Sequence, residues 1–476
     1  MASLDTGPQR HETMNFTLLN HATAPVMAPR LGKLAITGRK AISTPHYIPL
    51  STRGAVAHIA HDIMRDQTTI SSLYVGLEDF IETLPKKAIP PIYKTPTEPH
   101  ESAIHKFICM PEDTLLIMGP RRIPPIICPP TNTPNAVAIL TSVGFRHMTG
   151  EEYIGAVQKL KPDIVIGLAD LVVGQAPGVK RRMKMVDRTH AFTMDATEEL
   201  YGEGVAEDKR SRAAYFAPVL PLENTQQSLY LEELEDELRP YISGLALYEA
   251  ASLSIVPESL GELPRLLLSA PVTPQDVLRE VSLGADLLTI PFMGETSDAG
   301  MALTFTFPAP SSTAEPQPLA MDLWSSTFST DTQPLIEGCQ CYTCQEHHRA
   351  YINHLLSAKE MLAWTLLQLH NHHVMDLFFL GIRESIQQST FEADFQAFER
   401  AYESKLPEKT GEGPRLRGYH LPPSGPYQPK RNPRKYGRLD DAAEKYAEST
   451  SSVATPDAGA NELEEHGFAV KTTSMM

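Results

Sequence analysis

Three cysteines and one histidine are the side chains of this sequence whose spacing points most clearly to chemistry. Cys339, Cys341 and Cys344 lie within six residues, and His370 follows 26 residues after Cys344. Three thiolates and one imidazole make up a common ligand set of structural zinc sites. Because four protein ligands leave no open position for water or substrate, such an ion stabilises the fold and performs no reaction. The spacing therefore predicts one structural Zn²⁺ per chain.

The cluster could instead be a chance grouping of cysteines or a disulfide with one thiol left over, and its fourth ligand could be a histidine other than His370. The chain has five cysteines, and an odd, sparse count is untypical of a secreted disulfide framework. His347, His348 and His354 are nearer to the cysteines in sequence than His370 and could compete with it. We expect His347 and His348 to be solvated residues in the first turn of a helix.

The segment that separates the cysteines from His370 must bring the two together. Its apolar residues recur every three or four positions, which predicts a helix. One unbroken helix from Arg349 to His370 would separate its ends by roughly 30 Å, at about 1.5 Å per residue. Cys344 and His370 could not then share an ion. We therefore expect the helix to fold back near residues 357–359 and to form a hairpin pinned by the metal.

Length and composition are those of a large protein without a membrane span. The 476 residues include 42% hydrophobic residues, which suffices for one large barrel with additions. The longest apolar runs, such as Leu115–Met118, are too short to cross a bilayer. Residues 1–6 lack the basic-then-apolar order of a secretory signal. With its unpaired cysteines, the chain is expected to be cytoplasmic.

The net charge of −16 bears on possible partners. A protein that binds nucleic acid by itself usually has an excess of basic residues or a basic face. Basic clusters at residues 180–184 and 430–435 could contact phosphates, although most such clusters are simply solvated. The composition therefore does not support RNA binding by this chain alone.

Short apolar segments alternate with helical patterns over the first 300 residues. Helices are predicted at 150–160 and 274–283. Strands are predicted at 34–36, 47–50, 163–168, 241–246, 265–269 and 286–290. This alternation is typical of a parallel α/β architecture, and its length fits a (β/α)8 TIM-type barrel. A doubly wound open sheet is the alternative, but no glycine-rich phosphate loop opens a helix.

The chain is expected to divide into four regions. These are a loose lead-in at 1–29, a (β/α)8 barrel at 30–330, a zinc-binding helical subdomain at 331–404 and a disordered tail at 405–476. The Ser, Thr and Pro content of residues 308–334 predicts a linker before the zinc region. Beyond Lys405 the composition becomes rich in Pro, Gly and charged residues and then in Ser, Thr and Glu, as in disordered segments.

Several motifs between about residues 30 and 402 resemble the tRNA-guanine transglycosylases. The most specific is the zinc array together with Arg349–Ile352 and His370-Asn371. Further matches are Leu31–Leu34, Thr44–Pro49, Ser243–Ala246, Val281–Asp286 and Ile382–Ile386. In the family, the segment that Ser243–Ala246 resembles is a strand end that faces the base pocket. The resemblance implies a (β/α)8 barrel with a zinc-bearing subdomain.

The family's reaction exchanges the wobble guanine of certain tRNAs for queuine or its precursor through a covalent ribosyl-enzyme intermediate. That chemistry needs one carboxylate as nucleophile and another that handles the proton on the base. By the resemblance, the nucleophile position is Thr289 and the proton-handling position is Thr141. The family's base-reading aspartate falls on Ala169, with Asp170 one residue later. The resemblance thus implies that this chain has no catalytic residues.

A family member with the scaffold but without these carboxylates is expected to be a non-catalytic subunit. The resemblance implies a heterodimer with a catalytic homologue, formed through the zinc helices, that binds tRNA within the complex. It also implies a cytoplasmic protein that associates peripherally with the mitochondrial outer membrane.

Two alternatives to this expectation stay open. One is an active transglycosylase that uses a displaced carboxylate, Asp170 or Asp286. Asp286 lies at a predicted strand start, where polar residues usually bond locally to the backbone. The other alternative is an unrelated zinc-stabilised RNA-binding protein.

Overall fold

The computed structural model describes residues 14–19, 27–81, 89–128, 131–141, 144–310 and 315–414. Most of the predicted disordered tail, residues 415–476, lies outside these segments. The predicted loose lead-in contains a strand, β1 (Met14–Leu18), which pairs antiparallel with β2 (Gly32–Ile36). The alternation of larger apolar and polar residues in β1 suits a half-buried strand, and the ring of Phe16 packs over Gly32, where a Cβ would clash.

Eight short parallel strands form a single sheet whose neighbours follow chain order. They are β4 (His46–Ile48), β7 (Ser72–Gly76), β8 (Leu115–Gly119), β11 (Ile164–Ile166), β12 (Ala214–Val219), β13 (Gly244–Leu247), β14 (Arg265–Leu267) and β15 (Leu287–Thr289). The last strand pairs with the first, Leu287 opposite His46. Between β4 and β7 the sheet is joined by a single bridge, Leu50 to Tyr74. This nearly closed barrel confirms the predicted fold and excludes the open doubly wound sheet.

The interior of the barrel is filled by apolar side chains from alternate strand positions. Leu266, Phe216 and Ile166 belong to one buried cluster that also contains Leu34 and Ile42 of the N-terminal sheet. That sheet, β1–β2–β3, ends with β3 (Ile42–Thr44) and adds its apolar face to the same core. The barrel is therefore a packed core and not a channel.

Helices and short 3-10 turns connect the barrel strands. The helices are α1 (His61–Gln67), α2 (Ala103–Phe107), α3 (Gly150–Leu160), α4 (Val179–Tyr201), α5 (Asn224–Glu235), α6 (Pro274–Ser282) and α7 (Pro291–Asp298). The predicted helix at 150–160 matches α3, whose first turn is capped by the Thr149 hydroxyl. The predicted helix at 274–283 is α6, which opens with a capping box between Thr273 and Asp276.

Three two-stranded sheets are formed by described residues outside the barrel sheet. Between β8 and α3 the chain forms β9 (Ala136–Thr141) and β10 (Gly144–Thr149), which the sequence analysis did not predict. The pair β5 (Ser51–Thr52) and β6 (Ala55–Val56) follows β4. The predicted linker at 308–334 contains β17 (Ala320–Asp322), which pairs with β16 (Met301–Leu303). Leu319 and Ala320 are buried there, because the proline-rich composition gives way to an apolar segment.

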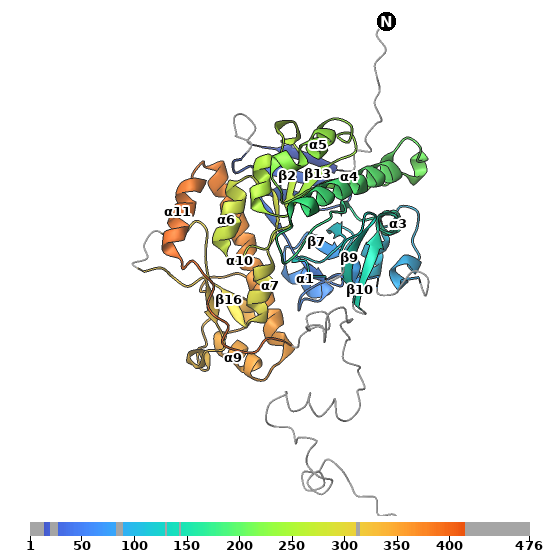
Figure 1. Cartoon of the computed structure of the whole chain (residues 1–476). Helices are drawn as coiled ribbons and strands as arrows, with labels where there is room; N and C mark the ends of the chain where they lie inside the picture. The colour runs from blue at the N-terminus through green and yellow to red at the C-terminus, as the bar shows by residue number, and fades with distance from the viewer. Residues whose placement is uncertain are drawn as a thin grey trace, which may run out of the picture. The chain divides into compact units, whose positions relative to one another are not determined.

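Four helices complete the described chain. They are α8 (Tyr342–Glu346), α9 (Arg349–Ser357), α10 (Met361–Gln387) and α11 (Phe391–Ala401). Between α9 and α10 the chain reverses at Lys359, whose φ is +56°, so the predicted break near 357–359 is confirmed. In Figure 1, α6, α10 and α11 lie beside the barrel. No helix within the described segments is long and apolar enough to cross a membrane.

The segment after α11 does not leave the fold at Lys405, where the disordered tail was expected to begin. Glu412 accepts a hydrogen bond of 2.6 Å from Lys359, and the Thr410 hydroxyl bonds to Asp322. Residues 145–414 lie in one compact unit with the described residues up to Thr141. The predicted division between 330 and 331 falls inside that unit and stays a prediction.

Candidate metal centre and barrel mouth

The four predicted metal ligands converge from two helices and the loop before them. Cys339 precedes α8, Cys341 is its N-cap, Cys344 lies within it, and His370 lies in the middle of α10. Their ligand atoms all lie within 4.8 Å of one another. The hydroxyl of Thr343 donates a 2.6 Å hydrogen bond to the carbonyl of Leu366, which ties α8 to α10 beside the cluster.

The distances within the cluster fit a tetrahedral ion. His370 Nδ1 is 3.9, 3.5 and 3.4 Å from the sulfurs of Cys339, Cys341 and Cys344. Zinc bonds of about 2.3 Å to sulfur and 2.0–2.1 Å to nitrogen at tetrahedral angles would separate sulfur from nitrogen by about 3.6 Å. The cluster can therefore hold a metal ion of the size and preference of zinc.

Hydrogen bonds around the cluster prepare His370 and the thiols for a metal. The Nε2 of His370 is 2.9 Å from the carbonyl oxygen of Leu303, to which it donates, so Nδ1 presents its lone pair to the sulfurs. His370 is fully buried. Hydrogen bonds from Cys341 and Cys344 hold the pKa of the Cys339 thiol below its usual range. The N–H of Cys344 donates to the sulfur of Cys341 at 3.3 Å.

The competing histidines stay outside the cluster. His354 is exposed on α9, whereas His347 and His348 are half-buried at the junction of α8 and α9. His347 and His348 are partly exposed, as expected of solvated residues, but they lie just before the first turn of α9 and not within it. Instead, His347 is the C-cap of α8, and Nδ1 of His348 accepts the Tyr351 N–H at 3.2 Å as the N-cap of α9.

Thr289 lies at the carboxyl end of β15, which in (β/α)8 barrels is the end that carries active sites. Its side chain is completely buried. The hydroxyl is 2.9 Å from the carbonyl oxygen of Ser269 and 3.4 Å from that of Leu267, and it donates to both. The hydroxyl hydrogen is therefore bonded to the backbone at the end of the neighbouring strand β14 and just after it.

Thr141 is the last residue of β9 and is also fully buried. Beside it lies a network that the sequence analysis missed. Glu78, next to the end of β7, accepts the N–H groups of Leu140 and Arg122, each at 2.8 Å. Arg122 also donates to Asp79 at 2.7 Å. The position of this acidic pair directly after a buried apolar strand was the signal that could have revealed it.

Burial raises the pKa of Glu78, and the positive charge of Arg122 opposes the rise. Asp79 receives a second hydrogen bond, of 3.0 Å, from the N–H of Arg53. The carboxylates of this network are therefore engaged with an arginine and with backbone donors. The arrangement ties β9 and the loop after β8 to the end of β7.

Asp170 follows β11 and is completely buried. Its carboxylate accepts hydrogen bonds from Asn132 at 2.6 Å, from Arg181 at 2.7 Å and from Arg188 at 3.1 Å. Burial alone would raise the pKa of Asp170, but these hydrogen bonds outweigh it and hold the pKa below its ordinary value. Both carboxylate oxygens are thus occupied by side chains of this chain.

Asp286 lies immediately before β15, at the opposite end of the barrel from Thr289. Arg30 binds both of its oxygens, one through Nε at 2.9 Å, and the N–H of Arg265 donates at 2.8 Å. The expected local bonding is therefore only part of the interaction, because Arg30 is distant in sequence. The residue joins the N-terminal segment to the base of the barrel.

One described cavity lies at the mouth of the barrel. It is lined by Tyr74, Arg121, Ala169 and Tyr248 among others. None of the described residues that line it carries a carboxylate. Ser243–Ala246, expected at a strand end facing the base pocket, covers most of β13 and is not among the lining residues, whereas Tyr248 just after the strand is.

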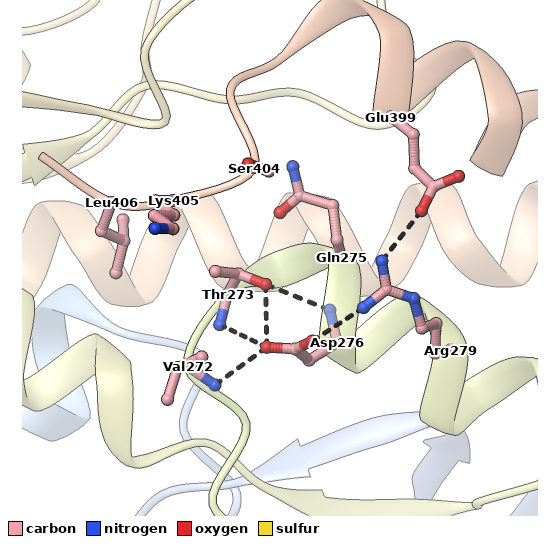
Figure 2. Close-up of a pocket in the computed structure, with 9 residues that line it drawn as sticks. All are labelled: Val272, Thr273, Gln275, Asp276, Arg279, Glu399, Ser404, Lys405 and Leu406. Atoms are coloured by element: carbon pink, nitrogen blue, oxygen red, sulfur yellow. Dashed lines mark hydrogen bonds and ion pairs between the residues drawn. The ribbon is translucent and has the colours of Figure 1, made fainter.

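A larger groove of about 570 Å³ lies at the start of α6, against the segment after α11. Figure 2 shows Arg279 between Asp276 and Glu399, to which it donates at 2.9 and 3.0 Å. Gln275 donates to the carbonyl of Glu403, and its Oε1 is buried without a hydrogen-bond partner. The charges in this groove are largely paired, so it joins α6 to α11 and presents no arrangement for catalysis.

Comparison with known proteins gives a consistent family. A family model described as queuine tRNA-ribosyltransferase matches residues 27–404. A Schizosaccharomyces pombe protein named queuine tRNA-ribosyltransferase accessory subunit 2 is 36% identical over 80% of this chain and 83% of its own length. Proteins of the same name from Drosophila mojavensis and Anopheles gambiae are 27% and 28% identical, over 75% and 78% of this chain and 86% and 87% of theirs.

Proposed function

The chain belongs to the queuine tRNA-ribosyltransferase family, and we propose that within it the chain is a non-catalytic accessory subunit. In this role it would pair with a catalytic homologue in a heterodimer and support the exchange of wobble guanine for queuine in tRNA. The observation that carries the proposal is the barrel mouth, where no carboxylate lines the described cavity and the Thr289 hydroxyl is bonded to backbone carbonyls.

The loss of catalysis is proposed from the two threonines. A ribosyl transfer needs a carboxylate that attacks the anomeric carbon and a second that handles the base proton. Thr289 and Thr141 occupy the corresponding positions by sequence resemblance, and neither carries a charge near pH 7. The Thr289 hydroxyl already donates to two backbone carbonyls, and no described neighbour is placed to remove its proton.

A displaced carboxylate is the main alternative, and its two candidates are poorly suited to it. Asp170 is bound by two arginines and an asparagine, and an attack on ribose would require it to leave these partners. Asp286 is at the amino end of β15, away from the mouth. The third interpretation, a zinc-stabilised protein that binds RNA alone, has little support in a chain with a net charge of −16.

We further propose that Cys339, Cys341, Cys344 and His370 hold one structural Zn²⁺. Support comes from their sulfur–nitrogen distances, from the buried donor set and from the Leu303 carbonyl that orients His370. The ion would stabilise residues 331–404 as the subdomain through which the two subunits pair. A cytoplasmic location and peripheral attachment to the mitochondrial outer membrane also belong to the proposal, on family resemblance alone.

Guanine exchange tests the proposed function directly. Radiolabelled guanine is incubated with a tRNA that carries guanine at the wobble position, together with this chain, a catalytic homologue, or both. We expect no incorporation by this chain alone, and incorporation by the two together above that of the homologue alone. Incorporation by this chain alone would refute the proposal. A mixture that forms no heterodimer in sedimentation analysis would also contradict it.

A further inference from the structure

The first turns of α4 carry a concentration of positive charge that is only partly paired within the fold. Within ten residues the helix presents Lys180, Arg181, Arg182, Lys184 and Arg188 against the single acid Asp187. No acidic residue occupies the first turn, and no side chain caps it. Cations near a helix N-terminus oppose the helix dipole and cost about 0.3–1 kcal/mol each. A sequence that breaks this rule repeatedly in one place is expected to do so for function.

Two of these cations already have a structural role. Arg181 and Arg188 turn inward and neutralise the buried carboxylate of Asp170. The other three do not contribute to that pair. Lys180 and Lys184 are exposed one helical turn apart on the same side, and half-buried Arg182 bonds through Nε to the carbonyl of Pro177 at 3.0 Å.

Exposed apolar side chains lie among the lysines. Val179 is 73% exposed and Met183 is 63% exposed, although the buried face of α4 offers ample apolar contact for such residues. Ile127, which is 60% exposed, lies against Gly174 in the loop that leads into α4. This basic face of α4 (Val179, Lys180, Arg182, Met183 and Lys184) therefore combines positive charge with uncovered apolar surface.

The basic face lies at the functional end of the barrel. The chain leaves the carboxyl end of β11 at Ile166 and passes through Asp170 into α4. Carboxyl ends of the strands and the loops that follow them are where (β/α)8 proteins bind their ligands. A ligand that met the barrel from this side would encounter Lys180 and Lys184.

We propose that the basic face of α4 binds the phosphate backbone of RNA, with Val179 and Met183 packing against its sugars or bases. The inference rests on the proposed function, because the RNA it would bind is the tRNA of the complex. A polyanion fits the two exposed lysines, Lys180 and Lys184, which have no carboxylate partner among the described residues and lie beside half-buried Arg182. A lipid surface fits less well, since the apolar face of α4 is already buried against the barrel.

The test is the salt dependence of tRNA binding. Lys180→Glu/Lys184→Glu is compared with Lys33→Glu/Lys209→Glu, whose lysines are equally exposed elsewhere and whose net charge change is the same. Binding to tRNA is measured from 50 to 200 mM salt, for each variant alone and with the catalytic homologue. The logarithm of the affinity falls with that of the salt concentration by about 0.7–0.9 for each phosphate contact.

For the α4 variant, we expect the plot of log affinity against log salt concentration to be shallower by about 0.7–0.9 for each lysine replaced. This variant should also bind tRNA more weakly than the control at every salt concentration. Equal slopes and affinities in the two variants would overturn the inference. Loss of binding to phosphatidylserine vesicles with unchanged tRNA binding would also overturn it, in favour of a membrane surface. If the unmodified chain forms no heterodimer, the proposed function fails. The weak tRNA binding of each variant alone at 50 mM salt, where phosphate contacts are strongest, still tests the role of α4, and equal weak binding by both variants would overturn it.

Discussion

Replacing Thr289 by aspartate returns a carboxylate to the position where the family's nucleophile is expected. The structure predicts that this change damages the fold without restoring a reaction. Thr289 is completely buried, and its hydroxyl donates to the carbonyl oxygens of Leu267 and Ser269. An ionised carboxylate has no hydrogen to donate, so it would face two acceptors with no compensating partner.

The cost can be estimated from the protonation that burial enforces. A buried carboxyl without donors has its pKa raised by as much as 3–5 units above about 3.9. If the folded pKa exceeds 7, the free energy of unfolding at pH 7 falls by about 1.36 × 3.1, or roughly 4 kcal/mol. Below the unfolded pKa of about 3.9 the group is neutral in both states and this cost vanishes. The destabilisation therefore grows as the pH rises from about 4 to 7.

The matched control is Thr289→Asn, which has almost the same shape as aspartate and no charge. Urea unfolding at pH 5 and pH 7 separates the two causes, because only the aspartate variant should lose further stability relative to asparagine as the pH rises. Guanine exchange by the purified aspartate variant should stay undetectable, since Thr141 still supplies no second carboxylate to handle the proton on the base. Exchange activity, or equal stability of the two variants at pH 7, would refute this reasoning.

Three further predictions concern other sites. Cys341→Ser should lower the zinc content from about one per chain and reduce the melting temperature, whereas Cys109→Ser, outside the cluster, should change neither; retained zinc would mean misassigned ligands. In urea titration, Asp170→Asn should lower the free energy of unfolding by about 2–4 kcal/mol, because it leaves two arginines facing a neutral amide. The control Asp187→Asn, at an exposed position, should have little effect in the same titration. Burial raises the pKa of Glu280 to about 7, so ionisation of this side chain lowers the free energy of unfolding as the pH rises from about 4.5 to 7. Glu280→Gln should therefore stabilise the protein by up to about 3 kcal/mol at pH 8 and not at pH 4. Equal gains at both pH values would contradict that pKa.

The predictable part of the fold followed from local patterns. Strands of four to six apolar residues and a helix opened by Thr149 were visible because burial and capping are encoded by neighbouring residues. The break between α9 and α10 was also predictable, since the metal ligands could meet only if the helix reversed. Strand β1, the pair β9–β10 and the barrel strands β7, β8 and β12 were not predicted, because short strands depend on partners that are distant in sequence.

The candidate sites divide in the same way. The cysteine–histidine cluster could be identified from spacing, because zinc geometry constrains the sequence. The contacts of Asp286 and Glu78 could not be identified from spacing, because their partners Arg30 and Leu140 are distant in sequence and meet them only in the folded barrel. The expectation that Ser243–Ala246 faces a base pocket stays a prediction, because the motif covers most of the short strand β13. Motif recognition gives residue types, while the direction of each side chain depends on register.

Helix α10 has a consequence for how this protein unfolds. One turn of it supplies His370 to the metal cluster, and Asn371 accepts the Leu303 N–H of β16 at 2.8 Å. One to two turns further on, Asp376 accepts a 2.8 Å hydrogen bond from Tyr47 of barrel strand β4. A single rigid rod thus fastens the metal cluster to the first strand of the barrel. Removal of the ion by a chelator should accelerate amide hydrogen exchange in β4 as well as in α8, and a fragment cut at residue 330 should not fold independently.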